Sequence, residues 1–306
     1  VISIDNLVNS SKENIKLIKE ISKKNFIFIE GDLRNKDLLN EIFSKYAIDC
    51  VVHFAGLKYI SESYLNPIEY FAVNVNGSVN LFEAMSKASV YEIIFSSSAT
   101  VYGSKHKLPW NESIRLKLPS NPYAQTKFIV ENILKNIHFN NRKWKIGILR
   151  YFNPVGYHSS GKIGEKINEG MSNLIPSIIK VISSREKFLK IYGDDYETLD
   201  GSGVRDYIHI NDLIDGHLKA MQFIKNNGNF NIWNLGRGEG YSVLQVIERF
   251  EYHLGKKIPY KIYSRRPGDL PAYWADANKA KAELLWSPHN DLDQMIKDTL
   301  AYLKNQ

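Results

Sequence analysis

Short apolar segments alternate with helical patterns along the first 150 residues, and this alternation constrains the fold more than any other feature. The segments have strand length, and they are Val1–Asp5, Asn25–Glu30, Cys50–Phe54, Glu92–Ser98 and Lys145–Tyr151. Helical patterns lie between them, near 12–23, 36–46, 67–88 and 122–138. Strands joined by crossover helices form a mostly parallel sheet, so the pattern predicts an α/β fold.

The rhythm changes at Phe152, where loops rich in Gly, Asn and Ser begin. Helices are predicted near 172–184, 211–226, 242–254 and 291–304, with strands near 188–192 and 230–235. We therefore predict one domain over residues 1–154 and a second, smaller α/β domain over residues 155–306. Some later segments are expected to fold back onto the first domain.

Composition narrows the range of partners. The net charge is +7, but the basic residues are scattered, which favours a solvated surface over a nucleic-acid site and also suits a small polyanion such as a nucleotide diphosphate. No apolar run approaches the ~18 residues that a membrane helix needs, and no secretory signal pattern is present. The single cysteine, Cys50, fits a reducing compartment such as the cytosol. We assign no metal ligands.

Tyr123 and Lys127 lie four residues apart, so a helix there places a phenol and an ammonium on one face. The cation favours the phenolate and can lower a phenol pKa that starts near ~10, which makes Tyr123 a candidate base. The spacing alone is a weak signal, because Tyr252 and Lys256 share it. Gly255 interrupts that second pair at an expected helix end.

A cluster of hydroxyls precedes Tyr123. The strand at Glu92–Ser98 opens into Ala99-Thr100-Val101-Tyr102-Gly103, and Ser98 stands at its end. Serines also end strands merely as turn formers. Together with Tyr123 and Lys127, however, Ser98 can complete a site for proton transfer.

The first strand ends in an acid. Val1-Ile2-Ser3-Ile4-Asp5-Asn6 has the form of the second strand of a dinucleotide-binding fold, whose terminal acid binds an adenosine ribose. Such a fold normally starts one strand earlier, with a glycine-rich turn ~20 residues before the acid. We therefore expect the natural protein to carry that strand and turn ahead of Val1.

Eight runs, in order along the chain, extend these observations. They are Asp5–Leu7, Glu30–Arg34, His53–Lys58, Ser96–Gly103, Tyr123–Lys127, Leu149–Gly156, Gly203–His209 and Gly268–Asp276. In these runs the sequence resembles the NAD-dependent UDP-glucose 4-epimerases (UDP-galactose 4-epimerases) of the extended short-chain dehydrogenase/reductase superfamily. The resemblance implies a Rossmann-like doubly wound parallel sheet that binds NAD over residues 1–154, and a UDP-sugar-binding domain over residues 155–306.

The resemblance also implies a set of cofactor contacts. Asp5 would accept both hydroxyls of the adenosine ribose, which favours NAD over NADP because an acid repels a 2′-phosphate. Asp32 and Leu33 would contact the adenine edge, and the Phe54–Lys58 turn would line the diphosphate and nicotinamide. The full set is Asp5, Asn6, Asp32, Leu33, Phe54, Ala55, Gly56, Lys58, Asn74, Ser96, Tyr123, Lys127, Tyr151 and Phe152.

A second set of residues is implied for the nucleotide sugar: Ser98, Tyr123, Asn153, Asn173, Leu174, Arg205, Tyr207, Arg266, Asp269 and Tyr273. Arg205 and Arg266 suit a diphosphate because their planar forks bind phosphate oxygens in pairs. Asp269 would accept hydrogen bonds from the uridine ribose. Tyr273 would leave little room at the sugar 2-position, which predicts a preference for UDP-glucose and UDP-galactose over N-acetylated sugars.

The implied reaction is the interconversion of UDP-galactose and UDP-glucose in galactose metabolism, with Ser98, Tyr123 and Lys127 as catalytic residues. Hydride passes to and from bound NAD through a 4-keto sugar. A cytoplasmic homodimer is expected, through helices near 67–88 and 122–138.

Three alternatives stay open. One is a related enzyme, either a uronate or pentose epimerase or a decarboxylase. Another is a dehydratase, although Ser98-Ala99-Thr100-Val101 lacks the acidic pair that dehydratases carry after a threonine. The third is a non-catalytic protein that binds NAD or a nucleotide sugar.

Overall fold

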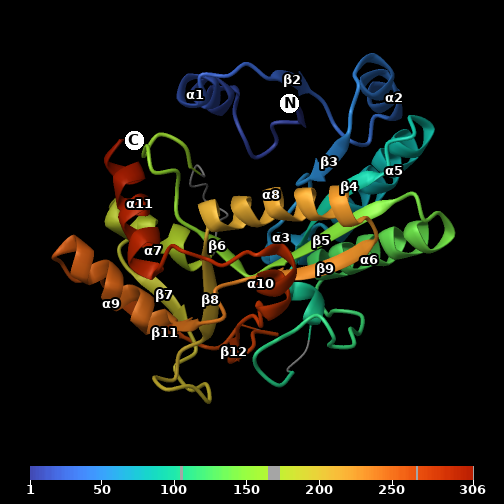
Figure 1. Cartoon of the computed structure of the whole chain (residues 1–306). Coiled ribbons are helices and arrows are strands. Elements are labelled where there is room, and N and C mark those ends of the chain that lie inside the picture. The colour runs from blue at the N-terminus through green and yellow to red at the C-terminus, as the bar shows by residue number, and fades with distance from the viewer. Residues whose placement is uncertain (104–105, 165–172, 267, 306) are drawn as a thin grey trace. The chain divides into compact units, whose positions relative to one another are not determined.

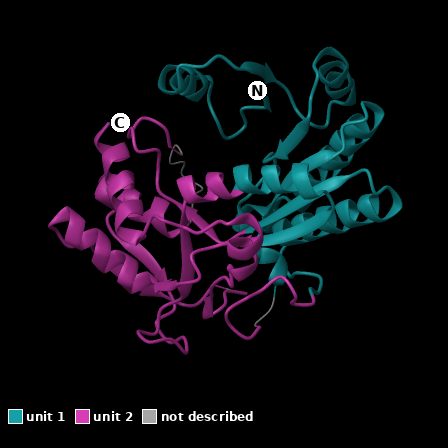
Figure 2. Ribbon diagram, in the orientation of Figure 1, with its two compact units in different colours: residues 1–103, 116–150, 217–233 teal, residues 104–115, 151–216, 234–306 magenta. Residues whose placement is uncertain are grey.

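The computed structural model describes residues 1–103, 106–164, 173–266 and 268–305. The chain forms two compact units (Figure 2). Unit 1 comprises Val1–Gly103, Leu116–Arg150 and His217–Trp233, and unit 2 comprises Ser104–Arg115, Tyr151–Gly216 and Asn234–Gln306. The division at residue 154 into a cofactor domain and a substrate domain stays a prediction, since these units are defined by compactness alone.

Unit 1 begins with a parallel pair of strands. β1 (Ile2–Asp5) lies in register with β2 (Ile27–Glu30), and α1 (Lys12–Ser22) connects them. α2 (Lys36–Lys45) follows, and the side chain of its N-cap residue Asn35 accepts a hydrogen bond from the Leu38 amide.

The main sheet of unit 1 has the strand order β3-β4-β5-β9 (Figure 1). These strands are β3 (Cys50–His53), β4 (Glu92–Ser98), β5 (Lys145–Tyr151) and β9 (Phe230–Leu235). β3 and β4 run parallel. The α/β class with parallel strands, as predicted, is confirmed.

Helices pack on both faces of this sheet. α5 (Gly77–Lys87) and α6 (Pro122–Asn140) bury apolar side chains such as Met85 and Leu134 against β4 and β5. On the opposite face Gly147 gives α8 (Ile210–Asn227) a close approach, because a Cβ at Gly147 would lie only 2.7 Å from Ile94 and 3.5 Å from Ile224.

The predicted helix over 67–88 is interrupted. It consists of α4 (Pro67–Phe71), a π-helical segment η1 (Ala72–Asn76) and α5. Two further elements of unit 1 were not predicted, α3 (Ile60–Leu65) and the 3-10 turn η2 (Ala99–Tyr102). π-helical segments of this kind often accompany functional sites, because they shift side chains out of the regular helical register.

β8 (Val204–His209) is the centre of a small sheet in unit 2. It pairs in parallel with β6 (Asn153–Val155) and β12 (Ala272–Tyr273), and antiparallel with β10 (Gly240–Ser242). A second sheet pairs β7 (Leu189–Tyr192) with β11 (Tyr260–Tyr263) in parallel.

Three helices of unit 2, α7 (Leu174–Ile182), α9 (Val243–Leu254) and α11 (Leu292–Lys304), contribute to an apolar core that includes Ile178, Phe250 and Met295. α10 (Asn278–Leu284) is a further helix of this unit. The predicted helix over 172–184 corresponds to α7, and residue 172 lies outside the described residues.

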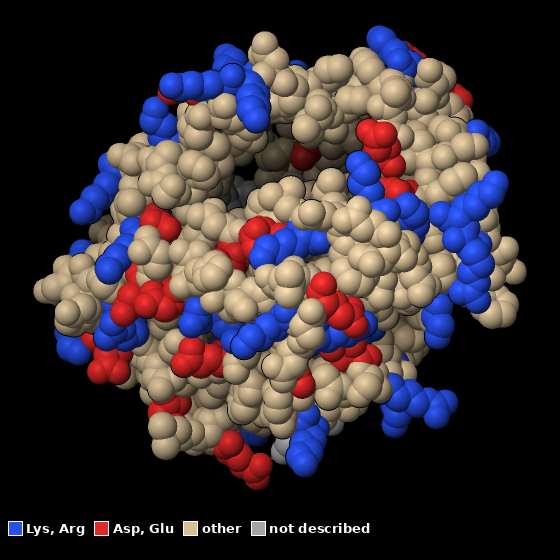
Figure 3. Space-filling view, in the orientation of Figure 1, with Lys and Arg blue, Asp and Glu red and all other residues tan. Residues whose placement is uncertain are grey.

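Two surface properties bear on partners. None of the helices within the described residues combines the length and apolarity needed to cross a membrane. Lys and Arg side chains are scattered over the face shown in Figure 3, with Asp and Glu among them. This mixed pattern differs from the continuous basic stripe typical of a nucleic-acid site.

Candidate functional site

The start of α6 fixes the predicted tyrosine and lysine. Asn121 caps the helix by accepting a hydrogen bond from the Ala124 amide at 2.8 Å, and Pro122 occupies the first turn, where no amide donor is required. Tyr123 and Lys127 follow one turn apart on the same side of the helix. The structure therefore confirms their predicted helical placement.

Lys127 is buried, with only 6% of its surface exposed. Its Nζ donates a hydrogen bond to the Ser96 carbonyl at 2.9 Å and lies 5.0 Å from the centre of the Phe95 ring. Burial lowers the pKa of Lys127 to about 8, and the Glu131 carboxylate opposes that shift. Lys127 therefore reaches the end of β4 as a cation below that pH.

Ser98 ends β4 and meets both η2 and Tyr123. Its Oγ accepts hydrogen bonds from the Thr100 amide at 3.2 Å and from the Thr100 hydroxyl at 3.0 Å. Burial raises the pKa of the Tyr123 phenol, and a hydrogen bond with Ser98 acts in the opposite direction. The net pKa of Tyr123 in this structure is therefore raised, whereas the pairing with Lys127 predicted a lowered pKa; the structure does bring Ser98 and Tyr123 together.

The turn after β3 approaches the same lysine. Gly56 has φ +153°, and a Cβ there would lie 3.0 Å from Asn74 Oδ1 and 3.7 Å from Lys127 Nζ, so only glycine fits without strain. Asn74, in η1, accepts from the Leu57 amide at 2.7 Å and donates to the Leu57 carbonyl at 2.9 Å. It also donates to the Thr126 hydroxyl at 3.0 Å, which ties the turn to α6.

The predicted residues around this turn differ in exposure. Phe54 is 56% exposed and packs its ring 4.8 Å from that of His217. Ala55 and Lys58 are exposed, whereas Ser96 is buried in β4. The turn thus presents Phe54, Ala55 and Lys58 outward, with Gly56 at the closest approach to Lys127.

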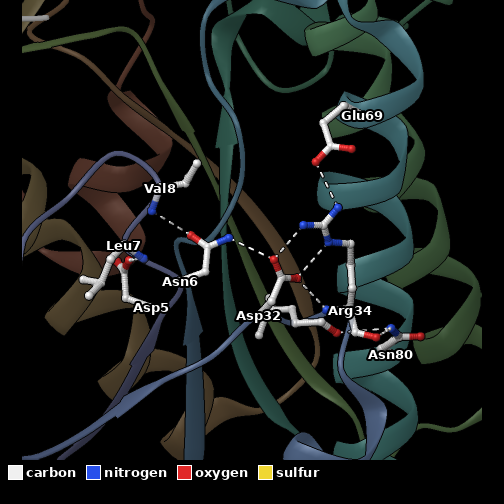
Figure 4. A network of polar contacts seen from close by, with 9 residues as sticks. Asp5, Asn6, Leu7, Val8, Asp32, Arg34, Glu69 and Asn80 are labelled. Carbon is white, nitrogen blue, oxygen red and sulfur yellow. Dashed lines mark hydrogen bonds and ion pairs between the residues drawn. The ribbon is translucent and has the colours of Figure 1, made fainter.

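A polar network links the ends of β1 and β2 (Figure 4). Asp5 Oδ1 accepts hydrogen bonds from the Leu7 amide at 2.7 Å and the Ser10 hydroxyl at 2.8 Å. Nothing within the described ranges donates to Asp5 Oδ2. Asn6 donates to Asp32 Oδ2 at 2.9 Å. One oxygen of Asp5 therefore remains able to accept a donor from a ligand.

Arg34 engages Asp32 through both of its carboxylate oxygens (Figure 4). Nε donates to Oδ1 at 2.9 Å and Nη2 to Oδ2 at 2.8 Å, while Nη1 donates to Glu69 at 2.9 Å. The hydrogen bond from Arg34 holds the pKa of Asp32 far below its usual range. The adenine contact predicted for Asp32 stays a prediction. The role of Arg34 was missed, although it lies in the matched run Glu30–Arg34.

In unit 2, β8 and β12 bring three predicted residues together. Arg205 donates from Nη2 to Asp269 Oδ1 at 2.9 Å, and its guanidinium lies 4.6 Å from the centre of the Tyr273 ring. The ring of Trp110 is also stacked on that of Tyr273, with the ring centres 5.0 Å apart and an interplanar angle of 9°. Trp110 was not predicted, because only the fold places it beside β12.

The other predicted residues of unit 2 lie elsewhere in the unit than Arg205, Asp269 and Tyr273. Asn153 stands opposite Tyr207 in the β6–β8 register and donates to the Asp206 carbonyl at 2.8 Å. Arg266 lies with its guanidinium 4.0 Å from the centre of the Tyr192 ring. Asn173 precedes α7, and Leu174 is its first residue.

Two predicted residues stand where β5 ends. Tyr151 is the last residue of the strand, and Phe152 is buried and donates its amide to the Leu235 carbonyl at 3.1 Å. Burial also raises the pKa of the Tyr207 phenol. Unit 2 therefore joins Arg205, Asp269 and Tyr273 directly, whereas no described contact joins Asn173 or Leu174 to them.

Known proteins resemble the chain over nearly its whole length. The family model described as GDP-mannose 4,6 dehydratase matches residues 1–299. A UDP-glucose 4-epimerase of Pasteurella multocida is 46% identical over 304 residues, covering 99% of this chain and 90% of that protein.

Two solved structures also resemble the chain over its whole length. The crystal structure of UDP-glucose 4-epimerase from Stenotrophomonas maltophila, with bound NAD and formylated UDP-arabinopyranose, has a TM-score of 0.97 and 39% identity over 100% of this chain and 90% of that one. That of the Bifidobacterium longum enzyme, in complex with NAD+ and UDP, has a TM-score of 0.95 and 43% identity, with coverage of 100% and 91%. The chain therefore belongs to the UDP-glucose 4-epimerases, enzymes of the extended short-chain dehydrogenase/reductase superfamily.

Proposed function

We propose that this enzyme interconverts UDP-galactose and UDP-glucose, with NAD as its cofactor. The observation that carries the proposal is the hydrogen-bonded pair of Ser98 and Tyr123 with Lys127 one helical turn away, in a chain of this family. Such a pair can move a proton to and from a sugar hydroxyl, and the lysine can hold positive charge beside it.

The residues of unit 1 fit a dinucleotide. Asp5 offers a carboxylate oxygen at a strand end, as a ribose site requires, and the Gly56 turn allows backbone to approach a ligand closely. We assign Asp5 and Asn6 to the adenosine ribose, Asp32 and Leu33 to the adenine, and the Phe54–Lys58 turn to the diphosphate and nicotinamide. Bound NAD would supply a reversible hydride acceptor for carbon 4 of the sugar.

Tyr123 performs the proton transfer. The positive charges of the Lys127 ammonium and of a bound nicotinamide ring would favour the phenolate form of Tyr123 against the effect of burial. That phenolate would remove the proton from the sugar 4-hydroxyl, and Ser98 would orient the hydroxyl by hydrogen bonding. Loss of the proton and of the C4 hydride leaves a 4-keto sugar. After this sugar rotates about its bond to the diphosphate, the hydride would return to the opposite face of carbon 4 while Tyr123 returns the proton to oxygen 4, so the configuration at carbon 4 is inverted.

Unit 2 supplies the groups for the nucleotide. Arg205 and Arg266 suit the diphosphate, because guanidinium forks bind phosphate oxygens in pairs. The ion pair between Arg205 and Asp269 orients both side chains before a ligand binds. Asp269 would then accept from the uridine ribose, with Asn153, Asn173, Leu174 and Tyr207 as further contacts.

Tyr273 is the proposed determinant of sugar preference. Trp110 on one side and Arg205 on the other hold its ring in place. A fixed ring beside the sugar 2-position would exclude an N-acetyl group, so kcat/KM should be much lower for UDP-N-acetylglucosamine than for UDP-glucose. Comparable values for the two sugars would contradict this assignment.

The decisive experiment is incubation of the purified holoenzyme with UDP-galactose and no added NAD, followed by chromatography of the nucleotide sugars. UDP-glucose is the expected product. A 4-keto-6-deoxy sugar would indicate a dehydratase instead, and unchanged UDP-galactose would indicate a binding protein.

We further propose that the enzyme is a cytoplasmic homodimer. Two observations in unit 1 support this. Leu65 and Ile68, on the adjacent helices α3 and α4, are 81% and 83% exposed, as apolar side chains at a subunit interface would be in an isolated chain. The single cysteine, Cys50, is a free thiol whose pKa burial raises to about 12, and an unpaired thiol suits a reducing compartment.

A further inference from the structure

Three residues of α6 face the C-terminal end of β4 at four-residue intervals. Lys127 donates to the Ser96 carbonyl at 2.9 Å, Tyr123 hydrogen-bonds with the Ser98 side chain, and the Ser97 hydroxyl donates to Glu131 Oε1 at 2.5 Å. Three consecutive residues of one strand thus contact residues on three turns of one helix. The proton-transfer residues form two of these three contacts, and Glu131 forms the third.

Glu131 is also bound to β5. Arg150 donates from Nε to Oε1 at 3.0 Å and from Nη2 to Oε2 at 2.7 Å, a bidentate arrangement. Both residues are buried, with 5% of Glu131 and 3% of Arg150 exposed. The Arg150 guanidinium lies 4.9 Å from the centre of the Tyr102 ring in η2. One carboxylate therefore connects α6, β4 and β5 directly behind the catalytic residues.

A buried ion pair is by itself weak evidence for a stabilising role. Removing two charges from water is costly, and buried ion pairs can often be replaced by apolar residues of similar volume without loss of stability. The surrounding core of unit 1 is apolar, so an apolar pair could fill this space. A role in the reaction explains why a charged pair is placed here.

We propose that Glu131, held by Arg150 and Ser97, is a positioning residue for the proton-transfer site, fixing α6 against β4 so that Tyr123 meets Ser98. This inference rests on the proposed function and deepens it. The two parts of the role are mechanical and electrostatic. The carboxylate sets the register between helix and strand, and its negative charge lies one turn from the Lys127 ammonium.

The electrostatic part depends on the other charges nearby. The titratable groups facing this region from its own and neighbouring elements are His53, Glu62, Tyr70, Tyr102, Tyr123, Glu131 and Arg150. His53 is neutral at physiological pH, because burial lowers its pKa to about 3. Glu62 accepts a hydrogen bond from Tyr70 at 2.9 Å, and among these groups Glu131 is the one whose charge supports Lys127.

The test compares four proteins: the wild type, Glu131→Gln, the double variant Glu131→Leu with Arg150→Met, and the control Glu83→Gln. Glu83, on α5, forms an ion pair with Lys36 of α2 at 2.9 Å, but the Glu83 side chain is 47% exposed. The double variant removes the buried pair without leaving an unpaired charge, so it is expected to fold even if the single variant does not.

Two measurements are made on each protein. The first is the pH profile of kcat and KM for UDP-galactose with the holoenzyme. The second is the titration of the Lys127 ammonium by NMR with 13C-labelled lysine, assigned from the spectrum of Lys127→Met. The second measurement does not depend on turnover, so it separates failure of this inference from failure of the proposed function.

We expect kcat of the double variant to fall about 10- to 100-fold with KM little changed, because small displacements of reacting groups are costly. We also expect the alkaline limb of its pH profile, and the Lys127 titration, to move to lower pH, since a stabilising negative charge is lost. Glu83→Gln should behave like the wild type. A folded double variant with wild-type kcat and an unshifted Lys127 titration would overturn the inference. If the Lys127 titration shifts in the double variant while the wild-type holoenzyme forms no UDP-glucose, the electrostatic role of Glu131 is upheld and the proposed function is rejected.

Discussion

At the scale of single residues, Tyr123 is the side chain on which the proposed chemistry depends. Tyr123→Phe removes the phenolic oxygen and leaves the ring in place. Because general acid–base catalysis contributes about 10²- to 10⁴-fold, kcat for UDP-galactose should fall by about that factor, while the affinity for UDP measured by calorimetry stays unchanged.

The matched control is Tyr252→Phe, which alters the other tyrosine with a lysine four positions on. Tyr252 is 72% exposed at the end of α9, where Gly255 terminates the helix. The Tyr252→Phe variant should therefore retain wild-type turnover. If Tyr123→Phe also turned over UDP-galactose at the normal rate, Tyr123 would not be the base.

At the scale of elements, the π-helical segment η1 supports the turn between β3 and α3 through Asn74. Asn74→Ala leaves the Leu57 amide and carbonyl without their partner, which should cost about 1–3 kcal/mol of unfolding free energy. The purified variant should also retain less NAD, measured from the ratio of absorbance at 260 and 280 nm. Asn132→Ala, on the exposed side of α6, serves as the control. Equal stability and equal NAD content in both variants would argue against a supporting role for η1.

Asp206 in β8 gives a prediction about pH. Its carboxylate accepts from the amides of Arg237, Gly238 and Ala275 at 2.8, 2.9 and 3.0 Å, yet burial raises its pKa to about 6. The folded state then binds more protons than the unfolded state between pH ~4 and ~6, so the contribution of Asp206 to stability falls as pH rises through that window, by about 3 kcal/mol.

This contribution can be isolated by comparison with Asp206→Asn, which does not titrate. The difference in unfolding free energy, wild type minus variant, should decrease from pH 4 to pH 6 and be constant above pH 7. A difference that is flat from pH 4 to pH 7, or that increases with pH, would contradict the raised pKa.

Sequence patterns predicted the long elements better than the short ones. β4 and β5, seven residues each, begin and end where predicted, because their apolar segments Ile93–Phe95 and Ile146–Leu149 mark them in the sequence. β12 has two residues and β10 three, and such strands exist only through pairing with β8, which no local pattern reveals. β8 itself carries Arg205 and Asp206 in its first half, which obscures its apolar pattern.

The candidate site shows the same limit. Tyr123, Lys127 and Ser98 could be predicted because spacing and a strand end bring them together. Glu131 could be suspected only from its place four residues after Lys127, since its partners Ser97 and Arg150 come from two different strands. Trp110 and the hydrogen bond from Arg34 to Glu69 depend on contacts between segments far apart in the chain, which sequence spacing does not encode, whereas the pairing of Arg34 with Asp32 is local.

At the scale of the whole molecule, the proposed homodimer predicts that the exposed apolar residues of α3 and α4 lie in the subunit interface. Leu65→Glu combined with Ile68→Glu would place charges in a buried interface, so the mass measured by light scattering should fall from that of a dimer to that of a monomer. Leu199→Glu is the control, because Leu199 is 97% exposed in a loop of unit 2 and should leave the mass unchanged. A double variant that keeps the mass of a dimer would place any interface elsewhere.

The central claim is that carbon 4 gives up a hydride and receives the same hydride back while Tyr123 moves the hydroxyl proton. The most direct test is to incubate the holoenzyme with UDP-galactose in D2O without added NAD and to follow the sugar by proton NMR. We expect UDP-glucose that retains its C4 hydrogen and carries no deuterium on the ring. Deuterium at a ring carbon, or no UDP-glucose at all, would contradict it.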